Sequence, residues 1–144
     1  MRVPPEVLDM LAAQPLFSGL SQKELRSIVA LGTPVDIKTG YVLTEEGAYG
    51  RDAFLIVSGT ARCLVGDKEV AVLGPGDLFG EISLLDKAPR SATAVANSDM
   101  RVTVFVRSEF VRLIEASPKI ALKLLAAMAA RLRSVDQGFV ASHG

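Results

Sequence analysis

Two charged side chains near the middle of the chain, Glu81 and Arg90, stand in a setting that could bind a small phosphate-containing molecule. Gly80 precedes Glu81, and because it has no Cβ it allows the backbone to approach a ligand closely. The guanidinium of Arg90 carries a planar set of donors that matches phosphate oxygens. The carboxylate of Glu81 can accept a hydrogen bond from a hydroxyl group. A cyclic phosphate beside a ribose hydroxyl would satisfy both side chains at once.

The segment around these residues is expected to change from strand to helical turn and back to strand. Phe79 and Gly80 end a strand, residues 81–85 can form one turn of helix, and Pro89 fixes the loop before Arg90. Unpaired amides at the start of a helical turn favour an anion. The alternative is that Glu81 and Arg90 form an ordinary surface salt bridge in a turn.

The wider segment resembles the phosphate-binding cassette of the cyclic-nucleotide-binding domain family. The chain reads F-G-E-I-S-L-L from Phe79 and P-R-S-A-T from Pro89. The family pattern is F-G-E-[IL]-[AS]-L-L, a short loop, and P-R-[ST]-A-T. Residues 46–59 are similar to a second stretch typical of the family, and the resemblance extends from Pro15 to about Val135. The family includes the catabolite activator protein, regulatory subunits of protein kinase A and cyclic-nucleotide-gated channels.

This resemblance implies roles for individual residues. Glu81 would accept a hydrogen bond from the ribose 2′-hydroxyl, with the amide of Gly80 nearby, and Arg90 would pair with the cyclic phosphate. Backbone or hydroxyl donors would come from Ile82, Ser83, Ser91 and Ala92. By alignment with the family, Cys63 would face the base pocket, and Leu73 and Val135 are further candidate ligand contacts.

The resemblance favours cAMP over cGMP as the ligand. A hydroxyl residue after the cassette arginine, here Ser91, can favour the guanine amino group, but a serine there is compatible with cAMP in bacterial regulators of the family. Those regulators read adenine with a Thr-Ser pair on the last helix, and the equivalent positions here are Val135 and Asp136. That adenine contact is therefore not expected, although Val135 could stack on the base as an apolar lid.

The elements that must position the cassette are predicted to be strands with helices at both ends. Short β-branched segments separated by glycine-containing turns recur at intervals of roughly ten residues. They cover residues 34–37, 41–44, 53–57, 61–65, 70–73, 92–96 and 102–106. Such spacing favours a sandwich or jelly roll, and the resemblance implies an eight-stranded antiparallel jelly-roll barrel. We expect one domain over 1–144, with helices over 1–33, the barrel over 34–107 including the cassette at 79–93, and helices over 108–138.

The helical ends carry recognisable start and stop signals. Ser21 and Glu24 form a capping-box pattern before a helix that Gly32 closes. Ser108 is expected to cap a short helix through Ile114. The pair Ser117-Pro118 predicts the start of a longer helix that runs to about Gln137 and stops at Gly138.

Apolar residues along this last helix fall at a/d-type spacing. They are Ala121, Leu125, Met128, Leu132, Val135 and Phe139. The stripe could pack on the chain's own barrel. It could instead form a lid that closes on bound nucleotide, with or without a dimer through the stripe.

Composition argues against several other classes of protein. Sixteen Lys and Arg residues balance sixteen Asp and Glu residues, so a nucleic-acid partner is not expected. No uncharged apolar run reaches the length of a membrane span, and the nearest, residues 120–130, is broken by Lys123. The single cysteine, Cys63, cannot form an internal disulfide and fits a cytoplasmic location. The only histidine is His143 in the tail, so no catalytic pairing, metal site or enzyme activity is predicted.

The leading interpretation is therefore a cyclic-nucleotide sensor or regulatory domain, either freestanding or part of a larger effector protein. One alternative is a catabolite-activator-like transcription regulator that lacks its DNA-binding domain, since only seven residues follow Gln137. Another is a degenerate domain used for protein–protein contact. The presence of both Glu81 and Arg90 argues against that alternative, because a contact surface does not need this pair.

Overall fold

The computed structural model describes residues 3–50, 52–86 and 88–143, and it leaves undescribed the side chains of residue 82 and residues 136–143. Predictions that concern the side chains of Ile82, Asp136, Phe139 and His143 therefore lie outside the described part of the chain. The N-terminal helices are α1 (Glu6–Ala12), η1 (Pro15–Phe17) and α2 (Gln22–Val29). The C-terminal helices are α3 (Arg107–Ala116) and α4 (Pro118–His143).

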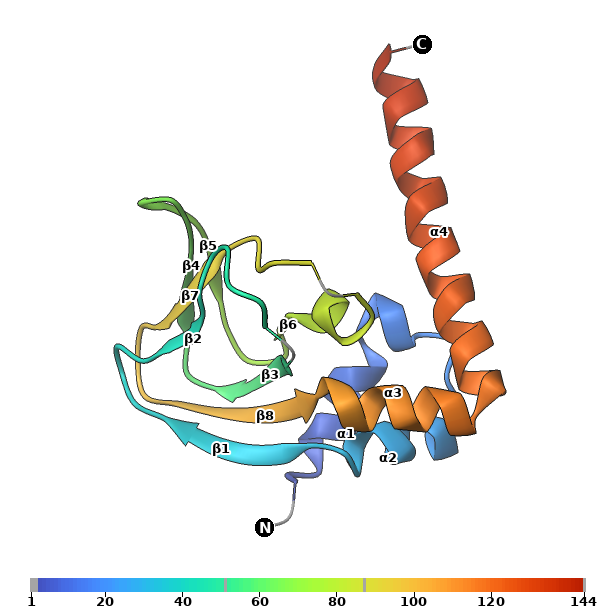
Figure 1. Cartoon of the computed structure of the whole chain (residues 1–144), viewed down its shortest axis with the longest axis horizontal. Coiled ribbons are helices and arrows are strands. Elements are labelled where there is room, and N and C mark those ends of the chain that lie inside the picture. The colour runs from blue at the N-terminus through green and yellow to red at the C-terminus, as the bar shows by residue number, and fades with distance from the viewer. Residues whose placement is uncertain (1–2, 51, 87, 144) are drawn as a thin grey trace.

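In the described part of the chain, eight antiparallel strands form two four-stranded sheets between these helices (Figure 1). One sheet has the order β1-β8-β3-β6 and the other β2-β7-β4-β5. The strands are β1 (Thr33–Ile37), β2 (Val42–Thr44), β3 (Asp52–Ser58), β4 (Ala61–Val65), β5 (Lys68–Leu73), β6 (Leu78–Phe79), β7 (Thr93–Ala96) and β8 (Met100–Val106), with a short 3-10 helix, η2 (Glu81–Leu84), between β6 and β7. The predicted jelly roll with flanking helices is confirmed.

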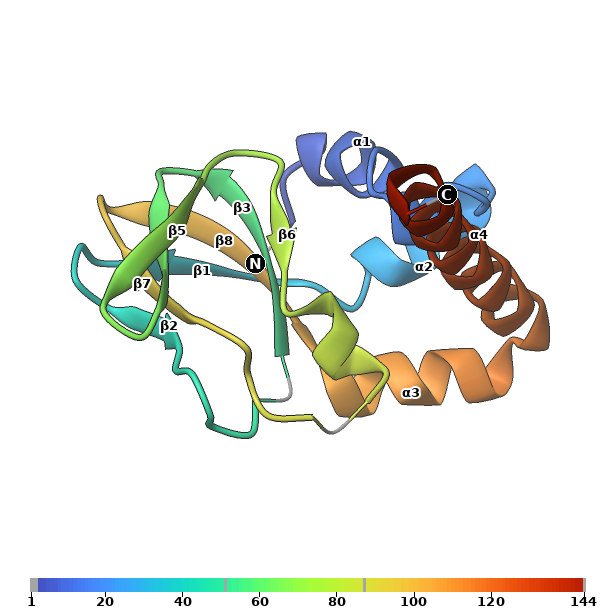
Figure 2. The same cartoon turned by 90° about the horizontal axis from the view of Figure 1, so that it is seen from above.

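Two apolar cores hold the molecule together. The first joins α1, α2, α3 and the base of α4 to the barrel, and it contains Phe17, Leu55 and Phe110. The second fills the barrel between its sheets and contains Ile56 and Val102. Figure 2 shows the consequence, since the barrel lies at one end of the molecule and the helices gather at the other.

The start signal of α2 is confirmed in detail. The amide of Glu24 donates to the hydroxyl of Ser21 at 3.2 Å, and the amide of Ser21 donates to the carboxylate of Glu24 at 2.9 Å. Both bonds satisfy amides that have no partner within the helix, which fixes where α2 begins.

Two predicted helix ends are wrong. Ser108 does not cap α3, because the helix begins one residue earlier and its N-cap position, Val106, makes no side-chain hydrogen bond. Gly138 does not stop α4, which continues to His143. A single glycine costs a helix only about 1 kcal/mol relative to alanine, so the long run of helix formers before it carries the helix through.

Leu125, Leu132 and Val135 of the apolar stripe of α4 are exposed, whereas Met128 packs against the first apolar core. Ile120 and Leu124 bury the first turns of the helix against the N-terminal helices. Leu125, Leu132 and Val135 keep between 62% and 68% of their surfaces exposed. Figure 1 shows α4 projecting away from the rest of the molecule. No helix within the described ranges is both long enough and apolar enough to cross a bilayer.

Candidate functional site

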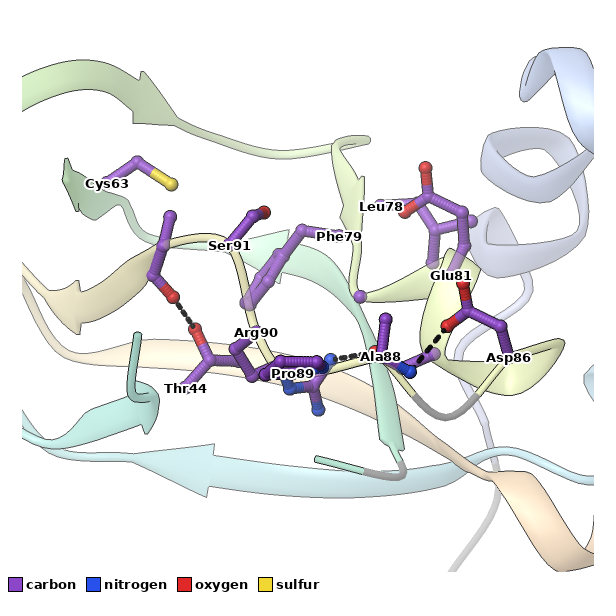
Figure 3. Close-up of a pocket in the computed structure, with 13 residues that line it drawn as sticks. Thr44, Cys63, Leu78, Phe79, Glu81, Asp86, Ala88, Pro89, Arg90 and Ser91 are labelled. Atoms are coloured by element: carbon purple, nitrogen blue, oxygen red, sulfur yellow. Dashed lines mark hydrogen bonds between the residues drawn. The ribbon is translucent and has the colours of Figure 1, made fainter. Parts of the chain in front are cut away.

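A cavity of about 440 Å³ lies beside η2 and the loop that leads into β7 (Figure 3). The predicted ligand contacts that line it are Cys63, Gly80, Glu81, Ser83, Arg90, Ser91 and Ala92. In Figure 3, Cys63 and Ser91 lie at one end, Glu81 and Asp86 at the other, and Phe79 and Arg90 between them. The volume falls in the range of about 300–1,000 Å³ that is usual for small-molecule sites.

Hydrogen bonds to uncharged groups hold the guanidinium of Arg90. Nη1 donates to Ser83 Oγ at 3.0 Å, and Nη2 donates to the carbonyl oxygen of Asp52 at 2.7 Å. The ion pairs found among the described residues all involve other side chains, so Arg90 and Glu81 do not form the surface salt bridge considered above. The site therefore contains a half-buried cation whose hydrogen-bonding partners are uncharged, and such a group favours an anionic ligand.

Burial lowers the pKa of Arg90, and the nearby carboxylate of Asp52 opposes this shift. Arginine titrates so far above neutral pH that the guanidinium remains charged. Burial also raises the pKa of the Cys63 thiol, which keeps it neutral at pH 7. Among the described residues that line the cavity, the positive charge thus comes from Arg90, and the Cys63 end is uncharged.

The backbone of Arg90 is fixed to the loop between β2 and β3. Its amide donates to the carbonyl of Ala48 at 2.8 Å, and its carbonyl accepts from the amide of Gly47 at 2.9 Å. Next to them, Thr44 Oγ1 donates to the carbonyl of Ala92 at 3.2 Å. These bonds continue the pairing of β2 with β7 as far as the cavity. The barrel, rather than a free loop, therefore sets the position of Arg90.

Gly80 turns the chain from β6 into η2 with a φ of +78°, which glycine adopts without strain. The amide of Ser83 then donates to the carbonyl of Gly80 at 3.0 Å, and this closes the short helix that begins at Glu81. The two-residue strand β6 is held by stacking of Phe79 on Phe54, with ring centroids 5.2 Å apart. This pair anchors the strand that delivers Gly80 and Glu81 to the cavity.

A family model described as "Cyclic nucleotide-binding domain" matches residues 34–117, which include the whole barrel from β2 onward and the cavity. The chain belongs to this family.

Several members of the cyclic nucleotide-binding domain family are similar to the chain over most of its length. The "Cyclic AMP receptor protein" of Thermus thermophilus is 37% identical over 127 residues, which cover 85% of this chain and 59% of the relative. The "CRP-like cAMP-activated global transcriptional regulator" of Mycobacterium tuberculosis is 28% identical over 135 residues, which cover 89% of this chain and 59% of the relative. The chain thus spans 59% of the length of these relatives.

Solved structures show the same relationship. The N-terminal domain of a transcriptional regulator from Streptomyces coelicolor A3(2) has a TM-score of 0.82 and 29% identity, and the match covers 91% of this chain and 95% of that domain. The catabolite activator protein of Thermus thermophilus has a TM-score of 0.68 and 35% identity, with 90% of this chain and 63% of that chain covered. The chain therefore shares the fold of the N-terminal domains of these regulators.

Two of the predicted contacts are not brought to the cavity. Leu73 pairs with Ala61 and packs against the core inside the barrel. Val135 lies on the exposed part of α4 and does not line the cavity. The side chain of Ile82 lies outside the described part of the chain. Among the described residues, no group of metal-ligating side chains is arranged to hold an ion.

The sequence predicted residues that would contact the ligand, but it did not predict the backbone groups that hold Arg90 in place. The carbonyl of Asp52 has no side-chain signature, because any residue type could supply it. Ala48 likewise acts through its backbone. Thr44 and Phe79 line the cavity as well. Phe79 belongs to the predicted cassette but was not among the predicted ligand contacts, and the register of β2 could have indicated Thr44.

Proposed function

We propose that the chain is a sensor domain that binds a cyclic nucleotide in the cavity beside Glu81 and Arg90. The observation that carries this proposal is the half-buried guanidinium of Arg90, which has only uncharged hydrogen-bonding partners in a cavity of suitable size. Membership of the cyclic nucleotide-binding domain family supports the same ligand class.

In this proposal Arg90 pairs with the cyclic phosphate, and Glu81 accepts from the ribose 2′-hydroxyl. Further donors come from Gly80, Ile82, Ser83, Ser91 and Ala92. Their common position around η2 and the start of β7 supports the assignment for the residues that line the cavity. Cys63 contacts the base end. Leu73 and Val135 would reach the ligand only after a movement of β5 or α4, and closure of α4 as a lid is part of the proposal.

We propose cAMP as the preferred ligand over cGMP. The names of two relatives, a cyclic AMP receptor protein and a cAMP-activated regulator, support this choice. Calorimetric titration with both nucleotides tests it directly. A preference for cGMP of tenfold or more, equivalent to about 1.4 kcal/mol, would overturn the choice of base while leaving the sensor proposal intact.

The proposed setting is a single domain in the cytoplasm that forms a homodimer through the exposed face of α4 or joins a larger effector. The exposed side chains of Leu125, Leu132 and Val135 support a partner on this helix. A second candidate function is the sensing part of a transcription regulator, which the 59% coverage of the relatives favours. The evidence for it would be further sequence beyond Gly144, together with duplex DNA binding of steep salt dependence by that longer protein.

Replacing Arg90 with alanine tests the central proposal. Charge-assisted hydrogen bonds contribute roughly 1.5–3 kcal/mol each, so R90A should weaken cAMP binding by about ten- to a hundredfold or more. Calorimetry measures the loss, and a thermal-shift assay with cAMP, cGMP and AMP shows whether the cyclic phosphate is required. The matched control is R101A, which removes an exposed arginine from a surface ion pair outside the cavity. Equal affinity of R90A and the unmodified protein would remove Arg90 from the site.

A further inference from the structure

Gly50, in the loop before β3, lies directly against the guanidinium of Arg90. A Cβ built on Gly50 would overlap with Nε, Cζ and Nη2 of Arg90. Gly80 limits another part of the same group, since a Cβ there would lie 2.6 Å from Nη1. Together with Ser83 Oγ and the carbonyl of Asp52, the two glycines form what we call the guanidinium slot.

We propose that Gly50 is a positioning residue for Arg90. Because Gly50 has no side chain, it leaves the space in which the guanidinium lies in the slot before a ligand arrives. The proposal rests on the function proposed above, in which Arg90 receives the cyclic phosphate. A long arginine side chain loses rotamer freedom when it is fixed, and this loss weakens binding if it occurs only on association. A slot that fixes Arg90 in the unbound protein removes that cost from the binding step.

Replacement of Gly50 and replacement of Gly80 by a residue with a side chain should have different effects on the backbone. Gly80 has a positive φ, so a side chain there would strain the backbone itself. Gly50 is not among the glycines with positive φ in the described part of the chain. Alanine can therefore adopt the backbone conformation of Gly50, and the overlap must be relieved by the far end of a flexible side chain, Arg90. G50A should move the guanidinium out of the slot and leave the fold intact.

The experiment compares G50A, R90A and the double variant with a matched glycine control. The control is G74A, because a Cβ on Gly74 would meet nothing within 4 Å and its φ is not positive. Loss of preorganisation should weaken cAMP binding by G50A by about three- to tenfold, as for one immobilised side chain. G74A should bind as the unmodified protein does, and G50A should have no further effect in the R90A background.

A readout without ligand separates this inference from the proposed function. The Nε–Hε resonance of Arg90 in a 15N-labelled sample should shift in G50A and stay in place in G74A. If the unmodified protein binds cAMP but G50A binds with equal or higher affinity, the inference about Gly50 fails and the sensor function stands. A further loss of cAMP affinity when G50A is added to R90A would also overturn the inference about Gly50, because Gly50 would then affect binding without Arg90. If the unmodified protein binds no cyclic nucleotide, the proposed function fails, and an unchanged Arg90 resonance in G50A would overturn the slot as well.

Discussion

Arg90 carries a full positive charge although it is half-buried. Its partners, Ser83 Oγ and the carbonyl of Asp52, use part of its donor capacity without neutralising the charge. Electrostatic attraction to an anion is stronger in such a setting than at an exposed arginine, because solvent and salt screen it less. These hydrogen bonds therefore keep the side chain of Arg90 in the site, and an anionic ligand would stabilise its charge further.

Glu81 provides a separate test, because its proposed partner is a hydroxyl rather than the phosphate. E81A should weaken cAMP binding by about ten- to a hundredfold, as expected for a lost hydrogen bond to a charged group. It should not weaken binding of 2′-deoxy-cAMP, which lacks the hydroxyl. Calorimetric titration of both nucleotides against both proteins completes the cycle.

The control for this cycle is D86A, which removes the other carboxylate at the same end of the cavity. D86A should keep the discrimination between cAMP and its 2′-deoxy analogue. If E81A still prefers cAMP over 2′-deoxy-cAMP by the same factor as the unmodified protein, Glu81 does not contact the ribose.

At the scale of elements, one carboxylate connects the helices at the two ends of the chain. Glu24 accepts from the amide of Ser21, which caps α2, and from Lys123 Nζ of α4 at 2.6 Å. The hydrogen bond from Lys123 and then that from the Ser21 amide lower the pKa of Glu24 from its usual 4.5 to about 2. The ionised carboxylate therefore favours the folded state above pH 4.5, and this contribution is lost as the pH falls towards 2.

E24Q should reduce the dependence of stability on pH in the acid range. At pH 7 the variant should be less stable than the unmodified protein, because glutamine lacks the charge that pairs with Lys123. The difference should shrink as the pH falls from 4.5 to 2, since protonation of Glu24 makes the two proteins alike. Urea unfolding at a series of pH values measures this convergence. E115Q, which changes an exposed glutamate of α3, is the control, and a constant difference between E24Q and the unmodified protein at all pH values would contradict the linkage.

A local signal predicted the start of α2 correctly, whereas the local signals at Ser108 and Gly138 did not predict the ends of α3 and α4, and features fixed by tertiary contacts were harder still to predict. The capping box of Ser21 and Glu24 is a local interaction, and it is present as expected. The strand that ends at Phe79 was expected from the cassette and is present as β6. Because β6 is only two residues long, it has no alternation to detect, and its place depends on the stacking of Phe79 with a residue of β3.

The same distinction applies to the site. The cassette residues from Gly80 to Ala92 are close in sequence, and most of them share one cavity. The direction of α4 is set by Ile120, Leu124 and the Lys123–Glu24 ion pair, which is a long-range contact. No local pattern encodes that direction, so the distance of Val135 from the cavity could not be predicted. The slot around Arg90 was missed for a similar reason, since Gly50 resembles a turn residue in the sequence.

At the scale of the whole molecule, the cavity and the helices are connected through the first apolar core. Leu84 of η2 is buried in this core with Phe110 of α3, and Phe110 packs against Phe17 of η1 with ring centroids 6.5 Å apart. The base of α4 rests on the same core through Ile120 and Leu124. A ligand that shifted η2 would therefore disturb the support of α4. Such coupling requires that the protein bind the ligand with different affinities when α4 is in its two positions.

In the homodimer proposed above, a second copy of the chain binds to the outer part of α4. Leu125 and Leu132 are seven residues apart, 62% and 68% exposed, and therefore on one face of the helix. Burial of apolar surface contributes about 25 cal/mol per Å², so a charge at the centre of such a face should prevent association. L132E should convert the proposed homodimer into a monomer, as measured by sedimentation equilibrium, while cAMP binding to the cavity persists. S134E introduces the same charge at an exposed polar position of α4 and should leave the dimer intact. If the unmodified protein is monomeric at all concentrations tested, or if L132E dimerises as well as S134E does, the exposed face of α4 does not mediate self-association.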